Sequence, residues 1–466
     1  MESFNFWDYS VWGFVNLFAV LAASLLLANL LKKSIGFLHR SLIPTSVLGG
    51  AILLIVASVY EAVTGDRMFQ TDFFAGKGSE MLECITYHAL ALGFIAATFK
   101  PSKEKFTGKR AREIFDSGVT TVSTYLLQGI LGLGITLIVS LVVSDFFPAA
   151  GILLPFGYGQ GTGQAMNYGN IYETDYGFLG GKSFGLAVAA LGFLSAAIGG
   201  VIHLNVLRKQ NKISGPLGEK AERYTAEEIQ TDDELPMNGS IDKLSLQVAL
   251  VVCTYVLAYL LMTGLGTLLP GMRATIFGFN FLLGVLMTVL IKAILGFLKK
   301  KQVVKRQYVN NFLMDRISGF FFDLMIVAGV AAIRIDVLKN YWVTLLILGV
   351  VGAFATYFYN RRIARLLFPE YAEEQFLVMY GMLTGTASTG TILLREIDPT
   401  FQTPAAENLV YQQLPAIVFG FPMMLLAVLA PQQPLTTLWI LIGFFVVMNL
   451  ILFRSRIFRR KGKTKE

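Results

Sequence analysis

The sequence is poor in charge, in cysteine and in histidine. Charged residues make up 15% of the 466 positions, and there are two cysteines and three histidines. So few cysteines exclude a disulfide scaffold. The histidines form no His-Glu-x-x-His motif and no plausible Ser-His-Asp set, and a phosphate-binding loop is missing as well. We therefore expect neither a membrane protease nor an ATP-driven pump, and the chain is not expected to be an enzyme.

Apolar residues are in excess. They make up 54% of the chain, and the mean hydropathy is +0.59. Such a chain cannot cover its apolar surface with polar groups, which excludes a soluble fold and a disordered one. The net charge of +8 comes mainly from basic residues between apolar runs. This placement indicates membrane topology and a lipid-bilayer partner rather than nucleic-acid binding.

A helix that crosses a bilayer needs about 20 mostly apolar residues. Eleven transmembrane helices are predicted on this basis, at 11–31, 43–61, 83–99, 117–144, 181–206, 245–268, 275–298, 317–335, 341–360, 407–430 and 435–453. The segments that connect these spans, together with the two termini, fall alternately on one side of the membrane and on the other. Of the 39 lysines and arginines, 31 lie in the segments of one side and four in those of the other. Because basic loops stay in the cytoplasm, this predicts an N-terminus outside and a cytoplasmic C-terminus.

Two further segments are too polar to cross the membrane. Residues 149–170 are rich in glycine, and residues 375–396 are rich in threonine and serine. Each must return to its own side for the charge distribution to hold, so we predict two re-entrant segments, one from each face. Irregular backbone at membrane depth is tolerated only where it is buried in protein or lines a wet cavity.

The chain then divides into two halves of one plan, each with four spans, a re-entrant segment and a fifth span. The halves are residues 1–206 and 245–430; a charged cytoplasmic linker at 207–244 joins them, and residues 431–466 add a further transmembrane helix and a basic tail. An odd number of crossings inverts the second half relative to the first. The predicted fold class is an all-α membrane protein with two inverted-topology repeats of five helices, which should superpose after rotation about an axis in the membrane plane.

Four motifs in the first half stand out. They are Ile43-Pro44-Thr45-Ser46-Val47-Leu48-Gly49-Gly50, Leu127-Gln128-Gly129-Ile130-Leu131-Gly132-Leu133-Gly134, Gly157-Tyr158-Gly159-Gln160-Gly161-Thr162-Gly163 and Ala197-Ile198-Gly199-Gly200. Together they resemble the bacterial glutamate:sodium symporter family over roughly residues 15–430. The resemblance implies a Na⁺-driven symporter of the cell inner membrane, an elevator mechanism in which one domain moves against a fixed scaffold, and a homodimer.

The first re-entrant segment is a candidate site for substrate and Na⁺. Broken helices at mid-membrane expose N–H groups that attract carboxylates and C=O groups that coordinate Na⁺, and glycines allow close approach. The alternative is a tightly packed hairpin without a ligand. The candidate substrate-binding residues are Gly159, Gln160, Gly161, Thr162, Gly163 and Gln164, and the candidate Na⁺ ligands are Gly157, Thr162 and Asn167.

The second re-entrant segment offers hydroxyl groups, which suit Na⁺ and carboxylates but can also bond back to the helix backbone. The candidate substrate-binding residues are Thr384, Thr386, Ser388, Thr389 and Arg395, and the candidate Na⁺ ligands are Ser388 and Thr391. The guanidinium of Arg395 can hold a carboxylate through two parallel hydrogen bonds. Alternatively, it pairs with Glu396, Asp398 or lipid phosphates at the rim.

Several polar residues lie within the predicted spans. Asp323 is a candidate for Na⁺ binding, proton transfer or binding a substrate amine, or for a structural pair. His88 more often than not would bond to a neighbouring helix in such a position, and it has no supporting cluster of metal ligands. Gln128, Gln412 and Gln413 are placed to line a pathway.

These features predict a secondary active transporter for symport of glutamate or a related small anionic amino acid, with Na⁺ as the coupling ion and no organic cofactor. One alternative is a Na⁺- or H⁺-coupled transporter of another small carboxylate. A second is an ion channel, because paired re-entrant loops also build selectivity filters. Accumulation of substrate against its gradient in proteoliposomes distinguishes a transporter from a channel.

Overall fold

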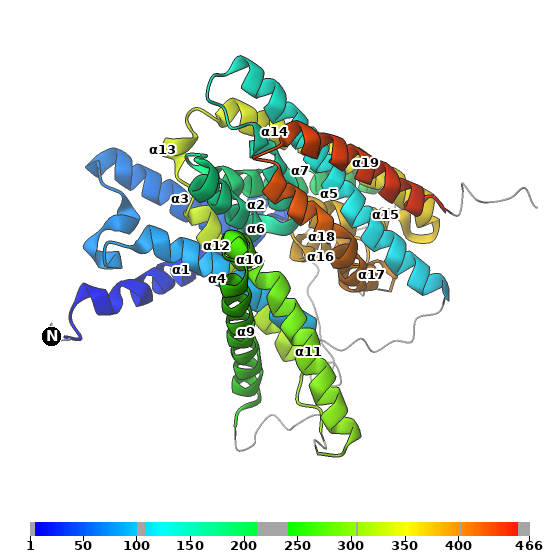
Figure 1. Ribbon diagram of the computed structural model, residues 1–466, viewed down its shortest axis with the longest axis horizontal. Helices are drawn as coiled ribbons and strands as arrows, with labels where there is room; N and C mark the ends of the chain where they lie inside the picture. Colours follow the sequence, from blue (N-terminus) through cyan, green and yellow to red (C-terminus); the bar gives the residue numbers. More distant parts are fainter. Residues whose placement is uncertain (1–4, 100–107, 212–240, 304–305, 400–401, 455–466) are drawn as a thin grey trace, which may run out of the picture. The chain divides into compact units, whose positions relative to one another are not determined.

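The computed structural model describes residues 5–99, 108–211, 241–303, 306–399 and 402–454, and every regular element in these ranges is a helix (Figure 1). Nine of these helices are long and apolar enough to cross a bilayer. This confirms a multi-pass, all-helical membrane protein. Most of the linker predicted at 207–244 and most of the basic tail after the last helix lie outside the described residues.

Nine of the eleven predicted spans are continuous apolar helices. They are α1 (Tyr9–Ser34), α3 (Thr45–Thr64), α4 (Gly78–Phe99), α5 (Gly108–Val142), α7 (Gly181–Lys209), α9 (Lys243–Leu268), α11 (Asn280–Lys300), α14 (Trp342–Leu367) and α19 (Pro434–Leu452). The remaining short elements are α2 (Gly36–Arg40), η1 (Met68–Gln70), η2 (Asp72–Phe74), η3 (Pro148–Ile152), η4 (Pro270–Met272), α10 (Arg273–Gly278), α13 (Ile335–Leu338) and η5 (Pro369–Tyr371).

The other two predicted spans are helical but irregular or polar. The span predicted at 407–430 is formed by α17 (Ala405–Tyr411) and α18 (Gln413–Leu429), which are bent by 51°. The span predicted at 317–335 is α12 (Asn311–Ala331), which does not qualify as a span by composition. The reason is that α12 begins earlier than predicted and takes in two more charged residues besides Asp323.

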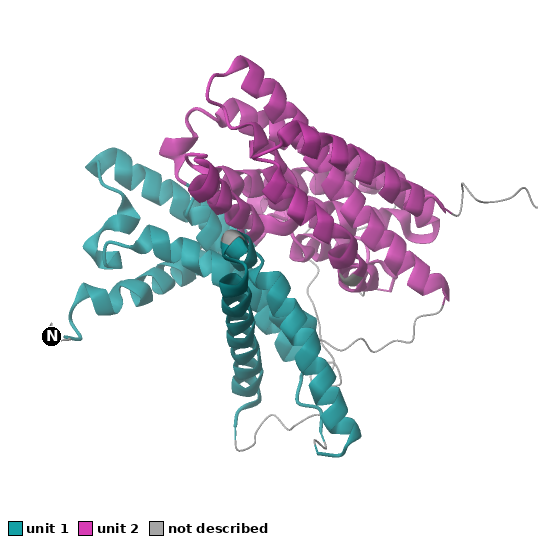
Figure 2. Ribbon diagram, in the orientation of Figure 1, with its two compact units in different colours: residues 1–30, 45–104, 221–333 teal, residues 31–44, 105–220, 334–466 magenta. Residues whose placement is uncertain are grey.

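The helices pack into two compact units (Figure 2). Unit 1 comprises Met1–Leu30, Thr45–Glu104 and Ala221–Ile333, and unit 2 comprises Leu31–Pro44, Lys105–Lys220 and Arg334–Glu466. Each unit therefore takes helices from both halves of the chain. The inverted relation between the halves stays a prediction.

Unit 1 is held together by α12, which packs against α3 and α4, and by α11, which packs against α4 and α9. Leu53, Leu82 and Val327 belong to one buried apolar cluster. Small residues allow these helices to approach closely: a Cβ on Gly50 of α3 would lie 2.6 Å from the Cβ of Val330 on α12.

His88 bridges two helices of unit 1, as expected for a single membrane histidine. Its Nδ1 lies 2.8 Å from the hydroxyl of Tyr255 on α9. The amide of Asn280 donates to the carbonyl oxygen of Tyr87 at 2.9 Å, so the same region also ties α4 to α11. These contacts give His88 a structural partner within the unit.

Unit 2 is arranged around α5, which packs against α14, α18, α19 and η3. In Figure 1, α19 (red) runs alongside α5 (cyan). Asn449 of α19 accepts a hydrogen bond from the hydroxyl of Tyr359 at 2.8 Å, and Arg454 forms an ion pair with Asp116 of α5 at 2.6 Å. The helix that lies outside the predicted repeat therefore belongs to unit 2 and is tied to it by polar contacts.

The contact between α5 and η3 depends on two glycines. A Cβ built on Gly132 would overlap the carbonyl oxygen of Gly151, and a Cβ on Gly151 would overlap the carbonyl oxygen of Gly132. Both obstacles are backbone atoms, which cannot turn aside as a side chain can. The two segments can therefore meet only with glycine at these positions.

We expect Gly132→Ala to destabilise the protein by about 1–3 kcal/mol, the usual cost of overpacking a close contact. Gly134 lies on the same helix, and a Cβ there meets nothing within 4 Å. Gly134→Ala is therefore the matched control. Thermal unfolding of the purified variants in detergent measures the difference; equal melting temperatures would contradict the close approach of α5 and η3.

Candidate functional site

The first predicted re-entrant segment is a helical hairpin. It follows η3 and is α6 (Leu153–Tyr176), which is interrupted at Gly161 with φ 77° and ψ −168°. The rings of Phe156 and Tyr168 stack with centroids 4.1 Å apart. In a straight helix, twelve residues span about 18 Å, so the chain must reverse at Gly161. The positive φ explains why glycine occupies the turn.

The second predicted re-entrant segment is also a pair of helices. It consists of α15 (Ala372–Thr384) and α16 (Ala387–Arg395), with the break at Gly385 and Thr386. The two helices pack backbone to backbone: a Cβ on Gly390 would lie 2.6 Å from the carbonyl oxygen of Val378. Neither this pair nor α6 is among the helices apolar enough to cross a bilayer.

Helix α5 contacts both helix breaks. The hydroxyl of Tyr125 donates to the carbonyl oxygen of Gly159, two residues before the first break, at 3.0 Å. One turn further along α5, Nε2 of Gln128 donates to the carbonyl oxygen of Leu383, two residues before the second break, at 2.8 Å. The two breaks, which are far apart in the sequence, therefore lie within about one helical turn of each other along α5.

Helix α7 also contacts both breaks, at a single residue. A Cβ on Gly192 would lie 2.5 Å from the carbonyl oxygen of Thr384 and 3.1 Å from Cδ2 of Tyr158. Thr384 ends α15, and Tyr158 precedes the first break. Only a residue without a side chain allows α7 to touch both hairpins here. The residues just before the two breaks thus form one buried region inside unit 2.

Polar side chains next to the first break come from α6. Thr162 and Gln164 follow the Gly161 break directly, and the side chains of both are fully buried at 0% exposure. The Oε1 atom of Gln164 accepts a hydrogen bond from Asn167 at 3.1 Å. Its Nε2 atom is buried and has no hydrogen-bond partner within the described residues. An unpartnered donor therefore lies in the first turn of the helix that starts after the break.

The candidate residues of the second hairpin mostly bond locally. The hydroxyls of Thr384 and Thr391 donate to the carbonyl oxygens four residues earlier, at 2.6 and 3.0 Å. Thr386 caps α16 by accepting from the backbone N–H of Thr389, and Ser388 is exposed. Back-bonding to the helix was the alternative interpretation of these hydroxyls, and the geometry favours it for the two threonines that bond in this way.

Arg395 lies away from the break of the second hairpin. Arg395 is the last of the nine residues of α16, about 13 Å along the helix axis from the break. This position favours the interpretation of Arg395 as a rim residue. Asp398 is engaged with its own loop, where it accepts from the backbone N–H groups of Gln402 and Thr403. Asp323 belongs to unit 1, whereas both hairpins belong to unit 2.

Sequence reasoning named Gln128 but missed that it belongs to a polar face on α5. Its members recur every three or four residues and are therefore on one side of the helix; they are Arg110, Glu113, Ser117, Thr121, Thr124 and Gln128. Their hydrogen-bond partners in other elements lie on α14, α15, α17 and η5; a further partner is Gln412, the residue between α17 and α18. The helical spacing of polar residues was the available signal, although it names no partner.

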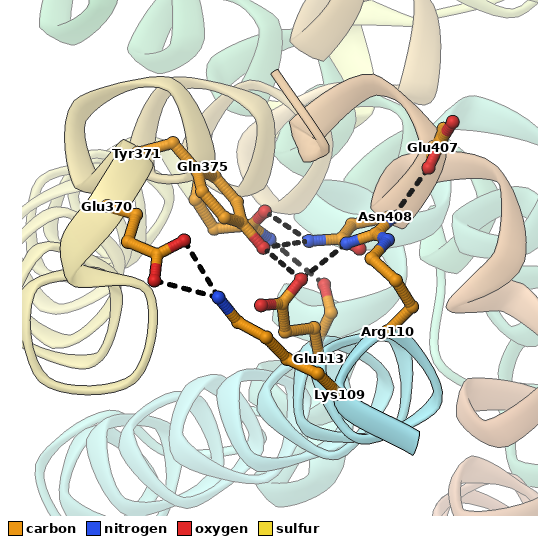
Figure 3. Close-up of polar contacts among 9 residues, drawn as sticks. Lys109, Arg110, Glu113, Glu370, Tyr371, Gln375, Glu407 and Asn408 are labelled. Atoms are coloured by element: carbon orange, nitrogen blue, oxygen red, sulfur yellow. Dashed lines mark hydrogen bonds and ion pairs between the residues drawn. The ribbon is translucent and has the colours of Figure 1, made fainter. Parts of the chain in front are cut away.

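The first turns of α5 carry the charged end of this face (Figure 3). Lys109 pairs with Glu370 at 2.7 Å, and Arg110 pairs with Glu407 of α17 at 2.7 Å and with Glu113. The hydroxyl of Tyr371 donates to Glu113 at 2.9 Å. Burial raises the pKa of the Tyr371 hydroxyl above its ordinary value, so it stays protonated and remains a donor.

The next part of the face is neutral and hydrogen-bonded at its centre, where only Oδ1 of Asn408 is buried without a partner among the described residues. Nδ2 of Asn408 donates to the Tyr371 hydroxyl at 3.1 Å and to Oε1 of Gln375 at 2.8 Å (Figure 3). Nε2 of Gln375 donates to Ser117 at 3.0 Å, and Ser117 in turn donates to Gln412. These bonds connect the base of α15 to α5 and α17, so the hairpin is anchored at the end away from its break.

Two broken helices packed against each other in a multi-pass helical protein are typical of a class of membrane protein, the secondary transporters. Comparison with known families is specific: the family model of the sodium/glutamate symporter matches residues 13–364. The chain belongs to this family, which confirms the resemblance carried by the sequence motifs. No curated protein matches the chain. The matched residues include the first hairpin and end before the second.

We expect Asn408→Asp to destabilise the protein by about 1–3 kcal/mol for each buried partner left without its donor. The change removes both hydrogen-bond donations and puts a carboxylate close to Gln375 and Tyr371. Asn170 lies on α6 in the same unit and is exposed, so Asn170→Asp is the control for the chemistry of the substitution. Thermal unfolding in detergent measures both; a variant at position 408 as stable as the control would show that the network contributes little.

Proposed function

We propose that the protein is a Na⁺-coupled symporter of glutamate or a related small anionic amino acid, and that the substrate binds at the paired helix breaks of unit 2. One observation carries this proposal. Two breaks from distant parts of the chain are brought together by α5 and α7, and the helix that starts after the first break has a buried, unpartnered amide donor on Gln164. A packing hairpin without a ligand gives no reason for such a donor.

The first break suits a carboxylate. The helix from Thr162 to Tyr176 begins there, and the N–H groups of its first turn have no carbonyl partner within the helix. The positive end of the helix dipole attracts an anion. Nε2 of Gln164 adds a side-chain donor in the same turn. The proposed substrate contacts are therefore the backbone from Gly159 to Gly163, with Thr162 and Gln164.

The coupling ion requires oxygen ligands instead. Carbonyl groups at the C-terminal end of a broken helix have the partial negative charge that coordinates Na⁺. The sequence candidates Gly157, Thr162, Asn167, Ser388 and Thr391 remain proposed ligands. Net movement of one positive charge inward with each substrate would gain about 2.3 kcal/mol per 100 mV of membrane potential.

The proposed transport cycle is of the elevator type. Both breaks belong to unit 2, so a substrate bound between them would move with that unit, and unit 1 would act as the scaffold and supply the contacts of a homodimer. The charge distribution supports an N-terminus outside, a cytoplasmic C-terminus and location in the cell inner membrane.

Uptake by the purified protein in proteoliposomes tests the proposal. Radiolabelled glutamate should accumulate above its outside concentration when a Na⁺ gradient points inward, and should not accumulate when choline replaces Na⁺. Uptake that only equilibrates would indicate a channel. Accumulation on a proton gradient without Na⁺ would assign a different coupling ion, and competition by other small carboxylates would redefine the substrate.

Gln164→Glu should weaken binding of an anionic substrate about ten- to a hundredfold, because a donor to the carboxylate is replaced by a second carboxylate. Gln210 is exposed at the end of α7, so Gln210→Glu introduces the same charge away from the breaks. Affinity is read from the substrate concentration that gives half-maximal uptake. A Gln164→Glu variant with unchanged affinity would move the carboxylate away from the first break.

A further inference from the structure

Gln128 is the last member of the polar face of α5, and its side chain is fully buried at 0% exposure. Nε2 donates at 2.8 Å to two oxygens, the hydroxyl of Thr356 on α14 and the carbonyl of Leu383 on α15. Because a carbonyl oxygen only accepts, this contact determines which end of the amide faces α15. The other end, Oε1, is buried without a hydrogen-bond partner among the described residues.

An acceptor buried without a donor costs free energy that a partner would recover. The position of this acceptor indicates what kind of partner it takes. Leu383 lies in the last turn of α15, which ends at Thr384. The final carbonyl groups of a helix have no intrahelical donor and carry the negative end of the helix dipole. A positively charged ligand is therefore favoured at this end.

The oxygens of the Gln128 amide and of the groups that it contacts are neutral. They belong to an amide, to the hydroxyl of Thr356 and to backbone carbonyls at the end of α15. Hard cations prefer oxygen ligands, and a set without carboxylates suits a monovalent ion, since it supplies no negative charge to balance a second positive one.

We infer that Oε1 of Gln128 is a ligand of the coupling Na⁺ at the C-terminal end of α15. This inference rests on the proposed function, because it takes Na⁺ to be the coupling ion. It places the ion at the second break. The two breaks then differ in polarity: an unpartnered donor on Gln164 lies at the first, where the carboxylate would bind, and an unpartnered acceptor on Gln128 lies at the second, where the cation would bind. It also assigns a role to a residue that lies outside both re-entrant segments.

The test measures Na⁺ binding without transport. The melting temperature of the purified full-length protein in detergent is followed as NaCl replaces choline chloride at constant ionic strength, with no substrate present. Na⁺ should stabilise the wild-type protein, because a ligand that binds only the folded state raises its stability. The Na⁺ concentration for half-maximal stabilisation is the readout.

Two variants separate the oxygen from the donor. Gln128→Met and Gln128→Glu both lose the hydrogen bonds that Nε2 makes to Thr356 and Leu383, but only Gln128→Glu keeps an oxygen in place of Oε1. Gln128→Met should raise the half-maximal Na⁺ concentration at least about tenfold. Loss of a residue that only supports a metal ligand already lowers metal affinity by about tenfold or more, and loss of a ligand should cost at least as much. Gln128→Glu should retain the Na⁺ effect at or below the wild-type concentration.

Gln375→Met is the matched control, since Gln375 is buried in the same network but both ends of its amide have protein partners. It should lower the melting temperature without moving the half-maximal Na⁺ concentration. If the wild-type protein does not respond to Na⁺, the proposed coupling ion is wrong, and the inference falls with it.

A response of the wild-type protein that Gln128→Met shares at the same Na⁺ concentration would overturn the inference and leave the proposed function intact. Loss of the Na⁺ effect in both Gln128 variants would overturn it as well, because Gln128 would then act by positioning α15 through Nε2. A normal Na⁺ effect combined with lost stabilisation by glutamate would assign Oε1 to the ammonium group of the substrate instead.

Discussion

The structure of unit 2 depends on one constraint: a helix broken inside a membrane protein leaves backbone groups open, and those groups need partners that lipid cannot supply. Unit 2 contains two such breaks, at Gly161 and at Gly385. The residues just before both breaks are buried and lie close to Gly192 of α7, whereas Ala387 and Ser388 after the second break are exposed. Tyr125 and Gln128 of α5 bond to carbonyl oxygens just before the breaks.

Helix α5 meets this constraint by having a polar face where most membrane helices have an apolar one. Charged pairs occur in its first three turns, around Arg110, Glu113 and Asp116. Deeper along the helix the members are neutral, from Ser117 to Gln128, which limits the cost of burying them. The face thus contacts the second hairpin at both ends: Ser117 bonds to Gln375 at the base of α15, and Gln128 bonds to Leu383 just before the break.

Most polar atoms in this arrangement are satisfied; three amides, those of Gln128, Gln164 and Asn408, each have one that is not, and the first two lie next to the helix breaks. Gln128 and Gln164 each have one buried atom without a partner, and the two atoms have opposite hydrogen-bonding character. A region selected only for stability would be expected to pair or remove such atoms. Their retention beside the helix breaks is the main reason to place an ion and an anionic substrate there.

The sequence by itself determined the local features: the apolar spans, the two interrupted segments and the family, which the match over residues 13–364 confirms. These follow from composition and from turns that need glycine, such as Gly161, and they involve only neighbouring residues. The sequence also named Gln164 and Thr162, because they are polar residues in a segment of alternating glycines. The span predicted at 317–335 shows the limit of composition, since α12 begins earlier and takes in additional charges.

Only the tertiary structure decided which distant segments meet. It drew each compact unit from both halves of the chain, paired the break at Gly161 with the break at Gly385, and gave the polar face of α5 its partners. It also placed Arg395 at the end of α16 remote from the break, where the sequence allowed either position. The physical reason is that helical periodicity defines the face on which a side chain lies, whereas the partner of that face is selected by packing among all the helices.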